Sequence, residues 1–80
     1  MNRELHIGRG YKHFKGKTYI PQRVVRHADD PEQLMIVYCD IREDEWWVRP
    51  MDEFMSEVDH EKYPDVEQRW RFECPEDKEE

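Results

Sequence analysis

Aromatic rings and cationic side chains recur close together along this chain, and they are the residues with the clearest capacity for chemistry. Rings beside guanidinium groups can hold a nucleobase, a proline-rich peptide or an extended acidic peptide. The same residues can instead be structural, with the rings filling a core and the cations stacked on them or paired with acidic loops. The candidate ligand-binding residues are Tyr11, His13, Arg26, His27, Tyr38, Trp46, Trp47 and Arg49.

Motifs for catalysis or metal binding are weak by comparison. Gly16-Lys17-Thr18 lacks the upstream glycine of a phosphate-binding loop, and Ser56, the only serine, is not part of a nucleophile elbow. The four histidines do not combine with the two cysteines at the spacing of a zinc site. We therefore expect no catalytic residue, no metal and no cofactor. An enzyme or enzyme accessory that uses His13 or His27 for proton transfer is kept as an alternative.

Charge is distributed unevenly and bears on the kind of partner. Residues 1–28 carry seven Lys and Arg against Glu4, whereas residues 29–80 carry six against nineteen acids. A basic first segment favours a nucleic-acid or nucleotide binder, although basic and acidic strands can also neutralise each other across one sheet. The net charge of −7 argues against nonspecific nucleic-acid affinity, which depends on phosphate neutralisation. A protein or peptide segment is therefore the expected partner, with nucleic acid as the alternative.

The cysteines and the hydropathy pattern bear on location. Cys39 and Cys74 lie far apart in the sequence, as expected of free thiols in a reducing compartment. The first ten residues contain no apolar run of the signal-peptide kind, and no stretch is long and apolar enough to cross a membrane. We expect a cytoplasmic protein without a membrane partner.

Short extended segments separated by turns must position these side chains. Tyr11–Phe14 and Thr18–Ile20 predict two strands joined by a turn in which Gly16 has a positive φ. Pro21 cannot donate to a ladder, so it predicts either an edge strand or a bulge before Val24–His27. Leu34–Cys39 is continuously apolar, which predicts a central strand covered on both faces.

The second half of the chain predicts two further strands around a helical turn. Trp46–Arg49 reads as a strand that ends at Pro50, with the two neighbouring indoles on opposite faces, one in the core and the other outside. Met51–Met55 predicts a single turn of helix that plugs one end of the fold through its apolar side. Alternation over Val66–Phe72 predicts a half-buried final strand.

These elements predict one small, mostly β domain. Five or six short strands with one short helical turn are typical of a small antiparallel barrel or rolled sheet. We expect a flexible lead-in over residues 1–7, one domain over residues 8–73, and a disordered acidic tail over residues 74–80.

Several of these segments together resemble the domain-of-unknown-function family 1653. The resemblance is carried in order by Tyr11–Gly16, Val25–His27, Val37-Tyr38 and Trp47–Pro50 with Phe54 behind it. It implies a small bacterial protein with an antiparallel SH3-like barrel and no settled activity. It supplies a fold without a function.

The residues favour a non-enzymatic binding module. The hypothesis is a shallow aromatic and cationic groove in which the outer ring of Trp46 or Trp47 lies beside Arg49, Arg26 and His13. A protein segment would be its ligand.

Overall fold

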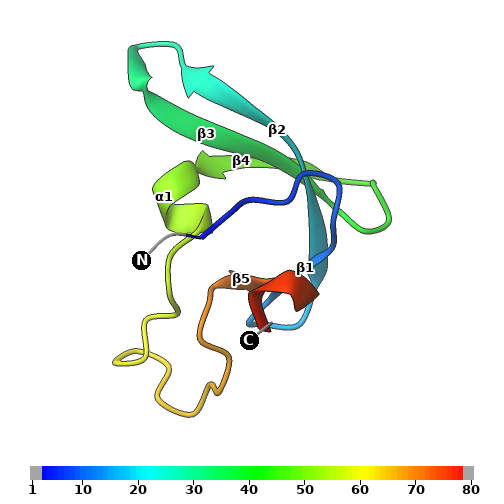
Figure 1. Cartoon of the computed structure of the whole chain (residues 1–80), viewed down its shortest axis with the longest axis vertical. Helices are drawn as coiled ribbons and strands as arrows, with labels where there is room; N and C mark the ends of the chain where they lie inside the picture. The colour runs from blue at the N-terminus through cyan, green and yellow to red at the C-terminus, as the bar shows by residue number, and fades with distance from the viewer. Residues whose placement is uncertain (1–2, 79–80) are drawn as a thin grey trace.

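The computed structural model describes residues 3–78 and shows a single five-stranded antiparallel sheet (Figure 1). The strands are arranged in the order β4-β3-β2-β1-β5. Between β4 and β5 the chain forms one short helix, α1, and after β5 it forms a 3₁₀ turn, η1. The elements are β1 (Tyr11–His13), β2 (Thr18–His27), β3 (Asp30–Asp40), β4 (Trp46–Pro50), α1 (Met51–Phe54), β5 (Phe72–Glu73) and η1 (Pro75–Lys78). The predicted mostly β fold class, with antiparallel strands and one short helix, is confirmed.

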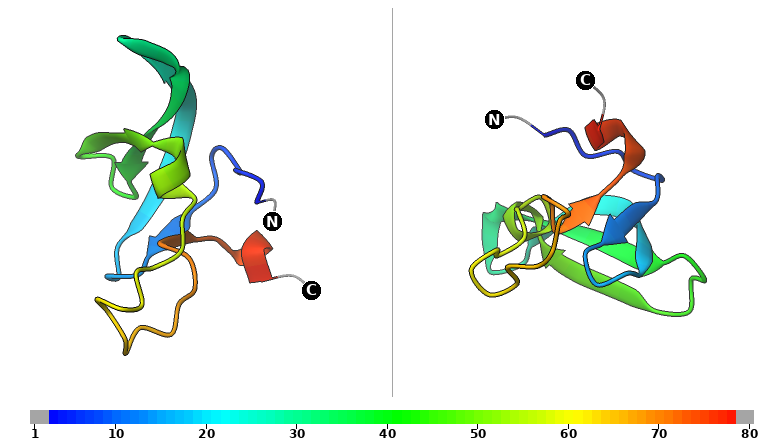
Figure 2. Two further views of the ribbon diagram at one scale, coloured as in Figure 1. Left: turned by 90° about the vertical axis from the view of Figure 1, so that its left-hand side faces the viewer. Right: turned by 90° about the horizontal axis from the view of Figure 1, so that it is seen from below.

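The sheet is strongly curved, and β2 is the strand that links its two halves (Figure 2). Its first residues pair with β1 and nearly its whole length pairs with β3. Pro21 lies opposite Tyr38, but Arg23 lies opposite Val37, so Gln22 is an extra residue on β2. Such a bulge bends a strand and increases its twist. The bulge predicted as one consequence of Pro21 is confirmed, whereas the alternative of an edge strand is wrong, because β2 is central.

The strand predicted to be central, Leu34–Cys39, lies within β3, next to the edge strand β4. Its burial on both faces is confirmed where the strand crosses the core, because Tyr38 and Cys39 are neighbours that point to opposite faces and both are buried. The turn at Gly16 has the predicted positive φ, 114°.

The core is built largely from aromatic rings on the inner face of the sheet. Phe54 and Phe72 stack with their ring centroids 4.1 Å apart, and Tyr11 and Tyr38 meet Phe54 edge to face at 5.5 and 5.3 Å. Such pairs add to the free energy gained by burying their large areas. The predicted plug is confirmed, because α1 places Phe54 fully inside while Met51 and Met55 pack against the cluster.

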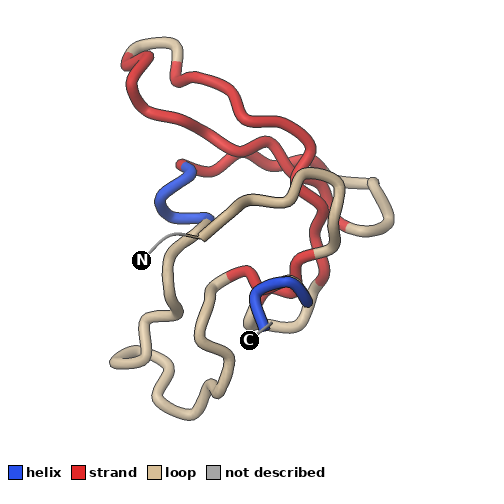
Figure 3. The backbone as a smooth tube through the Cα atoms, in the orientation of Figure 1, coloured by secondary structure: helices blue, strands red, loops and turns tan. Residues whose placement is uncertain are grey.

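The predicted final strand, Val66–Phe72, is wrong over most of its length. Residues 55–71 form a long loop in which Glu57 and Trp70 make one isolated bridge, and only Phe72 and Glu73 form β5 (Figure 3). The Gln68 side chain explains the departure, because its amide donates to the carbonyl oxygens of Lys12 and Trp70, both at 2.8 Å. These side-chain bonds satisfy two carbonyl oxygens without a backbone ladder.

Hydrogen bonds join the two ends of the described chain, where a flexible lead-in and a disordered acidic tail are predicted. Arg3 donates to the backbone oxygens of Met55 and Phe72 and to the Asp77 carboxylate at 2.6 Å. Cys74 is buried, and its backbone N–H donates to the same carboxylate. Composition alone predicts that an acidic tail is solvated. Here, however, the Asp77 carboxylate is paired with Arg3, near the other end of the chain. Residues 1–2 and 79–80 lie outside the described residues.

Candidate functional site

The eight predicted site residues do not form one groove. The structure divides them among the core and its rim, the far end of the β2–β3 hairpin, and the edge strand β4. The first group is Tyr11, His13, Tyr38 and Arg49, the second is Arg26 and His27, and the third is Trp46 and Trp47.

Tyr11 is a core residue, so its prediction as a ligand-binding residue is wrong. Its side chain has no exposed surface, and its hydroxyl accepts a hydrogen bond from the His6 backbone N–H at 2.9 Å. Burial raises the pKa of the Tyr11 phenol, because the charged phenolate would lose its hydration. Tyr11 therefore stabilises the fold and holds the chain that precedes β1.

Around the Phe72 ring the structure brings together three predicted residues, His13, Tyr38 and Arg49. The His13 and Tyr38 rings lie 4.8 and 5.5 Å from it, and the Arg49 guanidinium carbon lies 5.7 Å from its centre. Arg49 Nε donates to the Tyr38 hydroxyl at 3.2 Å, and Arg49 Nη1 lies 3.4 Å from the Glu53 carboxylate. We call these four residues, His13, Tyr38, Arg49 and Phe72, the Phe72 cluster.

His13 is held neutral in this cluster. Burial lowers its pKa to about 4, and the nearby charges of Arg49, Arg71 and Lys15 act in the same direction. Its Nδ1 accepts the Lys15 backbone N–H at 3.1 Å. The ring is therefore uncharged at neutral pH.

Arg26 and His27 lie apart from the cluster, at the end of β2 where the hairpin turns into β3. Arg26 Nη1 donates to the Pro31 carbonyl at 2.8 Å, and His27 Nδ1 accepts from the Asp29 backbone N–H at 3.0 Å. Both side chains thus stabilise the turn locally. The prediction that they share a groove with the tryptophans is wrong, because a long antiparallel hairpin carries its tip away from the rest of the sheet (Figure 1).

Trp46 and Trp47 both lie at the surface, which overturns the prediction that one of them fills the core. Trp46 is 57% exposed, Trp47 46% and the following Val48 57%. The two indoles do point to opposite faces, since Trp47 is paired with Tyr38 and Trp46 with Cys39. We call Trp46, Trp47 and Val48 the β4 surface.

The position of β4 explains this exposure. It is the last strand at one side of the sheet, so it has a neighbour only in β3. The interior beside it is already occupied by Tyr38 and Phe54. α1 starts directly after Pro50, so it covers β3 and the end of β4 rather than its beginning. Sequence patterning identified the apolar strand but not its place at the edge.

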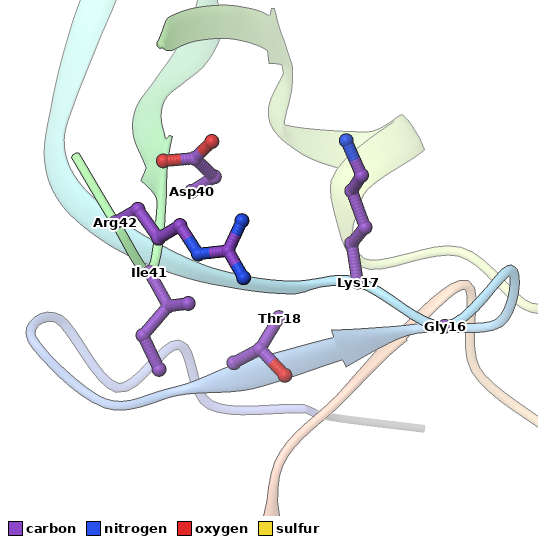
Figure 4. Close-up of a pocket in the computed structure, with 6 residues that line it drawn as sticks. All are labelled: Gly16, Lys17, Thr18, Asp40, Ile41 and Arg42. Carbon is purple, nitrogen blue, oxygen red and sulfur yellow. The ribbon is translucent and has the colours of Figure 1, made fainter. Parts of the chain in front are cut away.

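A cavity that sequence reasoning missed opens between two turns of the sheet (Figure 4). It measures about 350 Å³. Lys17 lines it from the turn between β1 and β2, and Arg42 lines it from the turn between β3 and β4. Asp40, the last residue of β3, also lines it. The Asp40 carboxylate is engaged by the Asp44 backbone N–H at 3.1 Å. No sequence motif marks this cavity, because its residues come from separate turns: Gly16, Lys17, Thr18, Asp40, Ile41 and Arg42.

Residues 3–78 lack the features of a metal site and of a membrane-spanning helix. That part of the chain has no cluster of three or more His, Cys, Asp or Glu arranged to bind a metal ion. Nor does it have a helix of the length and hydrophobicity needed to cross a bilayer. Cys39 and Cys74 are both buried, and neither forms a disulfide, as predicted for unbridged thiols.

The fold and its surface define a small antiparallel β domain with an aromatic edge strand. Residues 9–74 match the family described as "Protein of unknown function (DUF1653)". The match spans most of the chain, so the protein belongs to this family, and the resemblance suggested by its motifs is confirmed. No curated protein and no solved structure matches the chain.

Proposed function

We propose that this protein is a non-enzymatic binding module that recognises an extended protein segment along the β4 surface. The observation that carries the proposal is the run of three consecutive apolar side chains, each about half exposed, on an edge strand. Exposed apolar surface of this kind is typical of interaction sites, and tryptophan is enriched among the residues that dominate binding energy.

The chemistry beside this strand suits a peptide ligand. Trp47 and Arg49 are two residues apart on β4, so they share one face of the sheet. The Phe72 cluster lies inward of them and holds Arg49 through the Tyr38 hydroxyl. A rigid ring next to a fixed guanidinium can contact both apolar and acidic or carbonyl groups of an extended chain.

Nucleic acid is the less favoured ligand because the basic residues of the first segment are dispersed. Arg3 is engaged with Asp77, Lys17 directly precedes β2, and Arg26 is the next-to-last residue of β2. Nine residues of extended strand separate Lys17 from Arg26 by roughly 30 Å. Nucleic-acid binding needs several cations placed so that they contact phosphates along the same nucleic-acid backbone.

A peptide-display library tests the proposal. Selected peptides are synthesised, and their dissociation constants are measured by calorimetry against the wild type, Trp47→Ala and the control Ile7→Ala. Ile7 has a comparable exposure, 48%, but lies before β1. We expect Trp47→Ala to weaken binding by roughly tenfold or more and Ile7→Ala to leave it unchanged. A library without any enriched binder, or binders unaffected by Trp47→Ala, would contradict the proposal.

A further inference from the structure

The backbone of β4 presents a regular set of unpaired groups at the side of the sheet. Asp40 N–H donates to the Glu45 carbonyl at 3.1 Å, so these two residues form a hydrogen-bonded pair at the start of the β3–β4 ladder. Antiparallel pairs alternate between bonded and non-bonded. Trp47 and Arg49 therefore direct their backbone groups toward β3, whereas Trp46 and Val48 direct theirs outward.

Nothing in residues 3–78 pairs with that outward side. β4 ends the strand order, and no backbone hydrogen bond joins its outer side to a turn or loop of the described chain. An edge strand with open N–H and C=O groups is a template for another strand. The partner strand must fit the side chains and charges of β4.

Charge along β4 selects a second copy of the same strand in one register. If two β4 strands run antiparallel with Trp47 opposite Trp47 of the other copy, Trp46 lies opposite Val48, and their outward groups form four backbone hydrogen bonds. Glu45 then lies opposite Arg49, which is an attractive cross-strand pair. The pairing is therefore complementary in backbone hydrogen bonding and in charge.

The neighbouring symmetric register is unfavourable for two reasons. With Val48 opposite Val48, Glu45 would no longer face Arg49 of the other copy but would lie at the level of Met51, where β4 has ended and α1 begins, so the attractive cross-strand pair is lost. Trp46 would also face Pro50, which has no N–H to donate. The sequence of β4 therefore favours the register with Trp47 opposite Trp47 over the register with Val48 opposite Val48.

We propose that two copies of this chain associate through β4, adding strand to strand with Trp47 at the twofold axis. The inference rests on the proposed function, since it names the segment recognised by the β4 surface as the β4 strand of another copy. It joins two five-stranded sheets into one continuous sheet. A heterologous peptide strand is the competing occupant.

Analytical ultracentrifugation of the full chain up to about 1 mM, the range of small and weak interfaces, tests the proposal. Glu45→Arg replaces two attractive pairs per dimer by two repulsive ones, so we expect a dimer roughly tenfold weaker. Glu43→Arg is the matched control, because it makes the same change of charge in the same turn without facing Arg49. It should leave the dissociation constant unchanged.

A backbone test uses Val48→Pro and Val48→Thr. Proline removes the outward N–H without touching the ladder to β3, so it should weaken the dimer by roughly tenfold, whereas threonine keeps the N–H and should not. Circular dichroism confirms that each variant is folded.

A wild-type chain that stays monomeric over the whole range would overturn the self-pairing. So would a dimer that Glu45→Arg leaves unchanged, because Glu45 faces Arg49 of the other copy only in the proposed register. If the library peptides bind through Trp47 while the chain is monomeric, the proposed function stands and the partner strand is heterologous. If neither association is found, both proposals fail.

Discussion

At the scale of single residues, a few large rings make a core that so short a chain could not otherwise assemble. Phe54, Phe72, Tyr11 and Tyr38 are buried and contact one another edge to face or stacked. An 80-residue chain buries a smaller share of its surface than a large one, so each buried ring contributes much of the stability. The rings at the surface have a different role.

Truncation should separate these two kinds of ring. Phe54→Ala removes a fully buried ring, so we expect it to lower the free energy of unfolding by roughly 3–5 kcal/mol. Trp47→Ala should cost less than half as much, because nearly half of that side chain already contacts water. Urea unfolding measures both. Equal losses would mean that Trp47 is part of the core.

His13 should make stability depend on pH in a defined window. Its pKa is lowered from 6.5 to about 4 in the fold, by burial and then by the charges of Arg49, Arg71 and Lys15. Above pH 6.5 the ring is neutral in both states. As the pH falls to about 4, the unfolded chain binds a proton that the fold excludes, so the free energy of unfolding decreases.

The measurement compares urea unfolding of the wild type, His13→Gln and His27→Gln across that window. His13→Gln should lose less stability on acidification than the wild type, and His27→Gln, a substitution outside the Phe72 cluster, is the matched control. Because the same carboxylates titrate in all three proteins, their contribution to the unfolding free energy cancels when the curves are subtracted from one another. Parallel curves for wild type and His13→Gln would show that His13 is solvated like an ordinary histidine.

At the scale of elements, local patterns predicted most strands and the bulge that bends β2. The runs beginning at Tyr11 and Thr18, the plug at Phe54 and the bulge after Pro21 follow from turn chemistry and proline geometry. The exposure of both tryptophans could not be predicted, because residues of an edge strand and of a central strand can have the same sequence pattern. The order of strands, a non-local property, decides the difference.

Gly16 is a turn position where the backbone conformation itself can be tested. Its φ is 114°, a region that L side chains rarely adopt, although an added Cβ would meet no atom within 4 Å. Gly16→Ala should therefore destabilise by roughly 1–2 kcal/mol through strain alone. Gly10→Ala is the control, since that glycine lacks a positive φ and its Cβ would lie 3.4 Å from the Thr18 methyl. A cost that is equal at both positions would contradict this reading.

At the scale of the whole molecule, the two ends of the described chain are joined. Arg3 stacks at 4.1 Å on the Trp70 ring and pairs with Asp77, and both charged side chains are less than a tenth exposed. The two residues are 74 positions apart, so no local pattern in the sequence could connect them. Composition alone therefore does not indicate this contact between the two ends.

Removing one partner of this pair should be costly but limited. Arg3→Ala leaves the Asp77 carboxylate with a reduced set of partners, so we expect a clear fall in unfolding free energy. The loss should stay below the roughly 3–5 kcal/mol of a pair deep in a protein, because a terminus can fray. Lys12→Ala, at an exposed position of β1, should change little. Indistinguishable thermal melts for the two variants would argue against the contact.

The central claim is that β4 is a true edge, bonded on one side and open on the other. Amide hydrogen exchange of the chain in dilute solution, resolved by residue with NMR, tests it most directly. Trp47 and Arg49 should exchange slowly because their N–H groups bond to β3, whereas Trp46 and Val48 should exchange rapidly. Slow exchange at all four positions, or protection of Trp46 and Val48 instead, would contradict the account.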